Sequence, residues 1–220
     1  METGSSTTKR RLRSAAGRAF RIPTFTELYY QDSSNEGNPA LRPESAWSEE
    51  PGADFIPAKE WLGSLTLFSR QEQNVIDWIR QSVAEKWHSA NIRSLRADGV
   101  EIGLERSLRS QARLELHYSR LRIDAGTVNY LSKYVLDYAR DSATASASVR
   151  LPFGFAYRQA LNYKRRSDGQ SYWLVDGSLE HRFGRLRAAI DFTNLLNARY
   201  QDITGVDMPG RWLMATLSAP

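Results

Sequence analysis

The sequence contains no cysteine and no long apolar run. Without a thiol among its 220 residues, it can form no disulfide and offers no thiolate ligand to a metal ion. No stretch reaches the roughly 18 consecutive apolar residues that a membrane helix requires. Residues 1–14 also lack the apolar centre of a secretory signal peptide. These absences argue against a disulfide-stapled domain and against a helical membrane protein.

The charge balance gives little indication of a polyanionic partner. Lysine and arginine outnumber aspartate and glutamate by 30 to 25, for a formal net charge of +5. The basic residues are dispersed, apart from Lys9, Arg10, Arg11 and Arg13 in a polar segment rich in serine and threonine. We expect this segment, residues 1–14, to be a disordered leader, and we expect no nucleic-acid partner.

The most prominent positive feature is a repeated alternation of apolar and polar side chains. Between residues 143 and 151, every second side chain is apolar, and those between carry hydroxyls or a guanidinium. Residues 173–183 and 186–193 repeat the pattern. A period of two predicts β-strands with one apolar and one polar face. Because only alternate strand residues of a barrel meet lipid, the mean hydropathy of -0.53 is compatible with a membrane barrel.

The alternation predicts an all-β chain of about ten strands. The predicted strands are residues 15–22, 46–56, 62–70, 91–107, 112–121, 134–151, 155–165, 172–183, 186–194 and 210–218. Residues 109–111, 152–154 and 183–185 are predicted to be short turns. The longer predicted links are residues 29–43, 78–87, 126–133, 167–170 and 198–209. Short turns at one end and long loops at the other are typical of an antiparallel transmembrane β-barrel.

Two other kinds of protein remain as alternatives. A soluble β-sandwich that binds carbohydrate would show the same alternation, with its polar face in water. A passive porin-like channel would share both the alternation and the sorted loops. Dependence on detergent separates the sandwich from the two barrels.

Six short segments of the sequence form an ordered set. They are residues 17–30 (GRAFRIPTFTELYY), 37–44 (GNPALRPE), 74–78 (NVIDW), 99–101 (GVE), 191–197 (DFTNLLN) and 209–212 (PGRW). In this order they resemble the barrel of TonB-dependent outer-membrane receptors, and they are most similar to cobalamin and siderophore receptors within that family. The resemblance implies a barrel of about 22 strands around an N-terminal plug domain.

This resemblance assigns residues 15–220 to the C-terminal part of such a barrel. It implies a protein of the bacterial outer membrane that contacts lipid and takes up an iron-siderophore, a cobalamin or a similar scarce nutrient. The sequence contains no plug domain, so we expect the TonB complex to act only through that missing domain. We also expect the chain to be a fragment of a receptor, which aggregates alone or needs its missing half.

Polar side chains of two predicted strands are expected to face a watery interior. These are Arg113, Glu115, His117 and Ser119 on one strand and Arg158, Asn162 and Lys164 on another. An arginine or lysine facing lipid near the midplane would cost roughly 2–4 kcal/mol. Gly99, within a predicted strand, suggests a bulge or kink where a long strand curves.

Ligand contacts in such a receptor are expected from the long loops, whose aromatic and polar side chains are not needed to close the barrel. The candidate substrate-binding residues are Tyr29, Tyr30, Asp32, Trp78, Tyr130, Tyr134, Tyr172, Tyr200 and Asp202. The three histidines, His88, His117 and His181, have no partner at metal-ligand spacing. No nucleophile motif, phosphate loop or dinucleotide fingerprint occurs, so we expect no enzyme, no metal and no cofactor.

Overall fold

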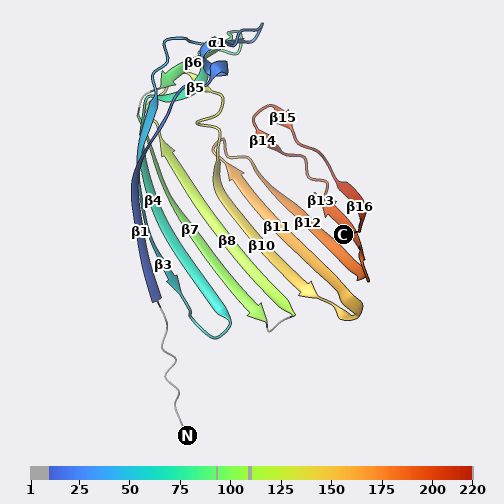
Figure 1. Cartoon of the computed structure of the whole chain (residues 1–220). Helices are drawn as coiled ribbons and strands as arrows, with labels where there is room; N and C mark the ends of the chain where they lie inside the picture. The colour runs from blue at the N-terminus through green and yellow to red at the C-terminus, as the bar shows by residue number, and fades with distance from the viewer. Residues whose placement is uncertain (1–9, 93, 109–110, 220) are drawn as a thin grey trace.

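The computed structural model describes residues 10–92, 94–108 and 111–219. Its main element is one antiparallel sheet of ten strands, here called the wall, whose strands follow one another along the chain (Figure 1). Across the sheet they are β1 (Arg10–Arg21), β3 (Glu44–Phe55), β4 (Trp61–Gln73), β7 (Leu95–Leu108), β8 (Ala112–Asp124), β10 (Ala139–Arg150), β11 (Phe155–Arg166), β12 (Ser171–Phe183), β13 (Leu186–Thr193) and β16 (Trp212–Ser218). The predicted all-β antiparallel architecture of about ten strands is confirmed.

The wall is open at both sides. Among the described residues, β1 pairs only with β3 and β16 pairs only with β13, so these two strands lie at free edges (Figure 1). An edge strand presents backbone donors and acceptors that have no neighbour to pair with. The sheet is therefore a section of a barrel and not a closed one.

The connections are sorted by length, as the sequence predicts. The links at residues 56–60, 151–154 and 184–185 join strands at one end of the wall, while the segments between β1 and β3, β4 and β7, β8 and β10, and β13 and β16 extend from the other, the loop end (Figure 1). Residues 109–110 of one predicted turn lie outside the described residues. Residues 167–170, expected to be a longer link, form a tight turn in which Arg166 N–H donates to the carbonyl of Gln170 at 2.8 Å.

A small second sheet covers the loop end and was not predicted. It consists of β2 (Asn35–Glu36), β6 (Trp87–Ile92), β5 (Val75–Arg80) and β9 (Leu131–Ser132), and together with the short helix α1 (Phe25–Tyr29) it is here called the cap. Residues expected as one strand, 91–107, are divided between β6 of the cap and β7 of the wall, and β10 begins at Ala139 instead of residue 134. Alternation alone does not tell a cap strand from a wall strand. In the described part of the chain, no helix is long and apolar enough to cross a bilayer.

The first strand begins earlier than predicted. β1 starts at Arg10, and Arg13 reaches across to β3, where its Nε lies 3.5 Å from Asp54 Oδ1. Residues 10–14, expected in a disordered leader, therefore belong to the wall. The remainder of that expected leader, residues 1–9, lies outside the described residues. By composition alone, the arginines of this segment are typical of a disordered basic tail. In the structure, the cross-strand contact of Arg13 with Asp54 stabilises the segment as a strand.

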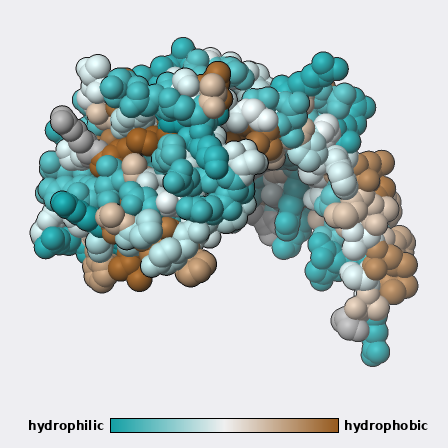
Figure 2. Space-filling model, turned by 90° about the horizontal axis from the view of Figure 1, so that it is seen from above, coloured by the Kyte–Doolittle hydropathy of each residue, from teal (hydrophilic) through white to brown (hydrophobic). Residues whose placement is uncertain are grey.

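The two faces of the wall differ in polarity. On the outer face, alternate positions of successive strands carry exposed apolar side chains, namely Leu65, Leu67, Ile102, Leu114, Leu116, Leu161, Leu179, Ile190, Leu213 and Leu217. Seen from the loop end, the arm formed by the C-terminal strands is largely brown on its outer side and teal toward the hollow (Figure 2). This is the arrangement expected when lipid covers one flank of each strand and water the other.

The inner face carries the polar side chains that the alternation assigned to it. Ser146 Oγ of β10 donates to Glu115 Oε2 of β8 at 3.1 Å. Farther along the sheet, Thr144 and Asn162 share a hydrogen bond of 2.9 Å, and Asn162 Nδ2 donates to Asp176 Oδ2 at 2.9 Å. These rows cross β8, β10, β11 and β12, so the predicted watery face is one continuous surface.

Gly99 does not form the bulge or kink that we expected. β7 keeps an unbroken register past Gly99 with both neighbours, β4 and β8, so no bulge is present there. A Cβ at this position would lie 2.1 Å from the Phe68 ring and 2.6 Å from the carbonyl oxygen of Arg120. Glycine suits this position because the Phe68 ring of the neighbouring strand and the Arg120 carbonyl occupy the space that a side chain would need, and a close approach of this kind is a recognised use of glycine inside a strand.

A pair of neighbouring substitutions tests the assignment of the two faces. Leu161 and Ala160 lie near the middle of β11 on the outer and inner face, respectively. We expect Leu161→Arg to destabilise a completed barrel that contains this chain, in lipid vesicles, by about 2–4 kcal/mol, because the charge enters the hydrocarbon near its midplane. Ala160→Arg, which places the same charge next to Asp176 on the polar face, is expected to cost far less. Urea unfolding in vesicles measures both, and an equal loss in the two variants would contradict the assignment.

Candidate functional site

All nine candidate residues lie at the loop end of the wall, in or next to the connections that the sequence analysis selected. They fall into two groups (Figure 1). Tyr29, Tyr30, Asp32, Trp78, Tyr130 and Tyr134 belong to the cap and its flanking loops, and Tyr172, Tyr200 and Asp202 belong to the rim above β11, β12 and β13. The two groups are built in different ways.

Polar side chains attach the cap to the wall. Glu44, the first residue of β3, accepts two hydrogen bonds from Arg21 at 2.7 and 2.8 Å and a third from the backbone N–H of Ile76 at 2.5 Å. Asn91 accepts from the Arg42 N–H at 2.8 Å and donates to the carbonyls of Arg42 and Asn74. Five of these residues, Arg21, Arg42, Glu44, Asn74 and Ile76, come from the short segments that carried the family resemblance, and here they have structural roles.

Asp77 is a buried carboxylate at the centre of the cap. Only 2 % of its surface is exposed, and it accepts hydrogen bonds from the Ser132 hydroxyl and from the backbone N–H groups of Trp78, Tyr134 and Val135. Burial raises the pKa of Asp77 above its usual value, although these donors partly oppose the shift. The Asp77 side chain thus holds the segment around β9 against β5.

Lys133 is surrounded by aromatic rings from two loops. Its Nζ lies 6.0 Å from the ring centroid of Trp78, 5.6 Å from that of Trp87 and 5.4 Å from that of Tyr134, and it donates to Asn35 Oδ1 at 3.2 Å. Cation–π contacts of this kind contribute about 0.5–1 kcal/mol each at exposed sites. Lys133 therefore links three separate connections of the cap, and Trp78 is a packing partner within it.

Asp32 organises its own loop. Its carboxylate accepts hydrogen bonds from the N–H of Ser34 at 2.7 Å, the N–H of Asn35 at 2.5 Å and the Tyr30 hydroxyl at 2.9 Å. The Ser34 amide makes the largest contribution to a pKa of about 2 for this carboxyl. Asp32 is therefore occupied by local contacts, as is typical of an Asx turn.

The rim group centres on Asp202. Its Oδ1 accepts hydrogen bonds from Lys164 Nζ at 2.9 Å and from the Tyr172 hydroxyl, and the rings of Tyr172 and Tyr200 lie 4.7 Å apart. Asp202 lies in β14 (Gln201–Ile203), which pairs with β15 (Val206–Asp207) to form the rim hairpin. Burial raises the pKa of Asp202, but its two hydrogen bonds and the nearby cations outweigh burial and lower the pKa below its usual value.

Arg166 joins three connections beneath the rim hairpin. Its side chain is 3 % exposed and contacts the carboxylate of Asp137, which precedes β10, and the backbone carbonyl of Asp202. The other oxygen of Asp137 accepts from the Thr204 N–H at 2.9 Å. A charged side chain this buried is costly unless an opposite charge lies beside it, and Asp137 supplies that charge. The loop between β13 and β16 is therefore held at both Asp202 and Thr204.

Of the nine candidates, three tyrosines keep about half of their surface exposed. Tyr29, Tyr30 and Tyr134 are 55, 46 and 50 % exposed, respectively. Tyr130 packs against the apolar cluster of Val75, Ile92 and Leu95, and the other candidates are engaged as described above. Sequence reasoning did not select Trp87, Lys133, Asp137 or Arg166. Trp87 and Lys133 lie in predicted links next to aromatic residues, which was their only signal. Asp137 fell within the predicted strand 134–151 and Arg166 directly after the predicted strand 155–165, and their partners lie far apart in the sequence.

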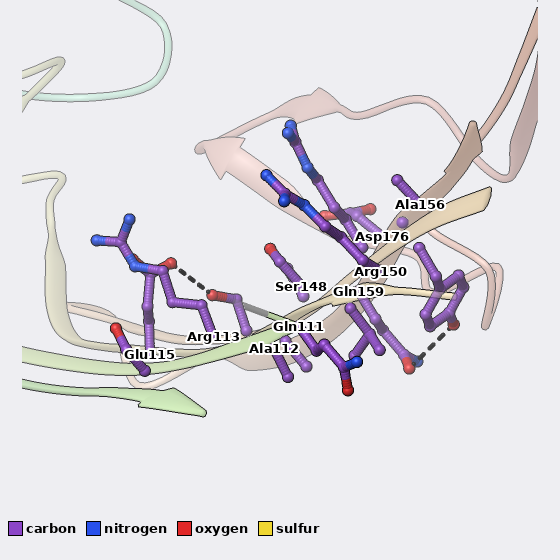
Figure 3. A pocket seen from close by; sticks show the side chains of 17 residues that line it. Gln111, Ala112, Arg113, Glu115, Ser148, Arg150, Ala156, Gln159 and Asp176 are labelled. Atoms are coloured by element: carbon purple, nitrogen blue, oxygen red, sulfur yellow. Dashed lines mark hydrogen bonds and ion pairs between the residues drawn. The ribbon is translucent and has the colours of Figure 1, made fainter. Parts of the chain in front are cut away.

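A hollow of about 760 Å³ lies on the inner face toward the short-turn end. Its polar lining includes Arg113, Glu115, Ser146, Ser148, Arg158 and Asp176. Figure 3 shows Ser148, Arg150 and Asp176 on one side of the ribbon and Gln159 on the other. The arrangement is that of an open, hydrated wall. Within the described residues, no group of three or more histidine, aspartate or glutamate side chains is arranged to hold a metal ion.

Comparison with known families agrees with this geometry. The family model described as "TonB dependent receptor-like, beta-barrel" matches residues 6–195. The chain belongs to this receptor family. Members of the family are outer-membrane receptors and transporters, and the barrel strands, polar inner face and long loops of one end are the parts that this chain supplies.

The chain covers only part of the length of each relative. The chain is 30 % identical over 89 residues to the vitamin B12 transporter BtuB of Vibrio vulnificus (strain YJ016), which is 40 % of this chain and 14 % of the relative. It superposes on the siderophore receptor PirA of Pseudomonas aeruginosa with a TM-score of 0.70 at 16 % identity, over 96 % of this chain and 36 % of that one. A ferric enterobactin receptor (PfeA) mutant of the same organism gives 0.71 at 15 % identity, over 96 and 38 %. The chain thus spans just over a third of these receptor structures.

The buried carboxylate of the cap leads to a prediction about pH. Because the pKa of Asp77 is raised in the folded cap, the cap gains stability as the pH falls from neutral toward that pKa and loses it as the pH rises through it. We expect Asp77→Asn to abolish this dependence. Hydrogen exchange at the Tyr134 and Val135 amides, corrected for the intrinsic rate, measures it.

Asp124→Asn provides the control, since Asp124 ends β8, just before the connection that carries Tyr134 and Val135, and accepts a hydrogen bond only from the Gly126 N–H among the donors described. That variant is expected to keep the pH dependence of the parent chain. If the Asp77→Asn cap still responded to pH as the parent does, another group would control it.

Proposed function

We propose that this chain forms the C-terminal section of the barrel of an outer-membrane receptor that imports a scarce nutrient by the TonB-dependent route. The observation that carries the proposal is the continuous polar inner wall below a structured loop end, in a member of the receptor family. A wall of this kind holds hydrated protein or solvent inside the barrel and exposes its apolar flank to lipid.

The ligand we propose is an iron-siderophore, a cobalamin or a similar chelate. Support comes from the relatives: one is a vitamin B12 transporter, another is a siderophore receptor, and a ferric enterobactin receptor mutant has been crystallised in complex with enterobactin. The exposed tyrosines of the cap offer flat apolar surfaces with a hydroxyl at the edge, which suits a ligand of mixed polarity. We therefore place the first ligand contacts at Tyr29, Tyr30 and Tyr134.

Coupling to energy is proposed to require a second part of the receptor. The resemblance of the sequence implies a plug domain inside the barrel, on which the TonB complex acts. The polar rows of the wall are the surface on which such a domain would rest. The outer-membrane lipid contacts the opposite flank.

Uptake by a completed receptor tests the proposal. Residues 10–219 are joined to the plug and N-terminal strands of the siderophore receptor PirA and produced in a bacterial host that lacks its own siderophore and cobalamin receptors. We expect accumulation of a radiolabelled iron-siderophore or cyanocobalamin, and we expect it to stop when TonB is removed. Accumulation that continues without TonB would indicate a passive channel. The plug and N-terminal strands with no added C-terminal part provide the background.

The three exposed tyrosines give a more local test. We expect Tyr30→Ala and Tyr134→Ala each to weaken binding of the imported ligand by about 1–2 kcal/mol, roughly 5–30-fold, because each removes an aromatic contact. Phe153→Ala is the control, since the Phe153 ring is fully accessible but lies in the turn Pro152–Gly154 at the opposite end of the wall. Equal effects at the two ends would argue against a ligand site in the cap.

A further inference from the structure

The rim hairpin is folded toward the inner face of the wall. Asp202, its central carboxylate, contacts Lys164 and Tyr172. These two side chains are neighbours across the β11–β12 ladder. Lys164 lies two positions from Asn162 and Tyr172 four positions from Asp176, the pair that shares a hydrogen bond on the inner face. Since side chains two positions apart in a strand share a face, Lys164 and Tyr172 belong to the polar interior surface. The hairpin therefore covers part of the interior at the mouth of the barrel.

The hairpin is held mainly by polar contacts. Besides the two hydrogen bonds of Asp202, the Thr204 N–H donates to Asp137 at 2.9 Å and Arg166 contacts the Asp202 carbonyl. Its apolar side chains contribute little, because Ile203 and Val206 remain 45 and 50 % exposed. A segment with few buried apolar contacts opens at a low free-energy cost. Removing the side-chain contacts of Asp202 should therefore lower the free-energy cost of opening the hairpin further.

The groups that surround the Asp202 side chain form a site suited to binding a carboxylate. An ammonium and a phenolic hydroxyl converge on one carboxylate oxygen, and the Arg166 guanidinium lies beside them. Charge-assisted hydrogen bonds to a carboxylate are among the stronger contacts that a protein makes. The Lys164 side chain is 38 % exposed, so the site opens to solvent on the inner side. The donors would be equally suited to a carboxylate from outside the chain.

We propose that Lys164 and Tyr172 form a subsite for a carboxylate group of the imported chelate, and that Asp202 occupies this subsite until the ligand displaces the rim hairpin. The identity of the ligand rests on the proposed function, whereas the contact of Asp202 with Lys164 and Tyr172 does not. The proposal narrows the ligand class to chelates that present at least one anionic carboxylate. It also gives the loop between β13 and β16 a role in admitting them.

Binding of citrate, a simple tricarboxylate, tests the subsite. Since Asp202 must leave before citrate enters, the affinity of the parent chain is reduced by the fraction of molecules in which the site is free. In the completed receptor used for the uptake experiment, held in detergent micelles, we expect Asp202→Ala to bind citrate about tenfold or more tightly than the parent, as measured by calorimetry. Adding Lys164→Met to Asp202→Ala should remove the gain. Circular dichroism confirms equal strand content in each variant.

Asp207→Ala is the matched control. Asp207 belongs to the same hairpin, but its carboxylate accepts only from Gln201 Nε2, at 2.7 Å, among the described donors. This variant should bind citrate as the parent does. If Asp202→Ala showed no gain, or if Asp207→Ala showed the same gain, the proposed subsite would be wrong and the contacts of Asp202 would be purely structural.

Movement of the hairpin gives an independent measurement. Because the sequence has no cysteine, spin labels can be attached at Val206→Cys and Ser148→Cys alone. We expect one narrow distance distribution in the parent chain, and a longer, broader one in the Asp202→Ala chain and in the parent chain with saturating citrate. An unchanged distribution in both cases would overturn the proposal. Neither experiment involves transport, so its failure is distinguishable from failure of the uptake experiment.

Discussion

Pairing of backbone groups between neighbouring strands is the constraint on which this structure depends. An amide or carbonyl left unpaired in hydrocarbon costs several kcal/mol, so a chain that crosses a bilayer as strands must keep each strand beside a partner through its whole depth. Once this ladder is fixed, the period of two assigns every side chain to lipid or to the interior. Irregular backbone is then confined to the two ends. The sorted loops, the polar rows from Glu115 to Asp176 and the exposed leucines of the outer face all follow from this one requirement.

Outside the membrane, strand pairing is no longer required, and the cap and the rim hairpin are stabilised in different ways. The cap has a small apolar centre of Val75, Ile92 and Leu95, and it surrounds a buried carboxylate with four donors. The rim hairpin has no comparable centre among the described residues and is held by ion pairs and hydrogen bonds, chiefly those of Asp202 and Arg166. A cap of the first kind is rigid, while a hairpin of the second kind can exchange its contacts for those of a ligand.

The sequence predicted the wall well and the loop end poorly, for a physical reason. Alternation is a local signal, so it identified the strands and placed Arg113, Glu115 and Asn162 on the correct face. It could not separate β6 from β7, because a cap strand and a wall strand alternate alike. Contacts between loops join residues far apart in the chain: Lys164 was expected on the inner face and Asp202 in a loop, but their pairing spans 38 positions and has no sequence signature.

The directions of the two edge strands restrict what can complete the barrel. β1 runs toward the cap and β16 runs away from it, as an even number of antiparallel strands requires. A segment that closes the ring with antiparallel neighbours throughout must therefore contribute an even number of strands as well. An odd number would leave one parallel pair at the closure, and parallel pairing is slightly less stable per residue.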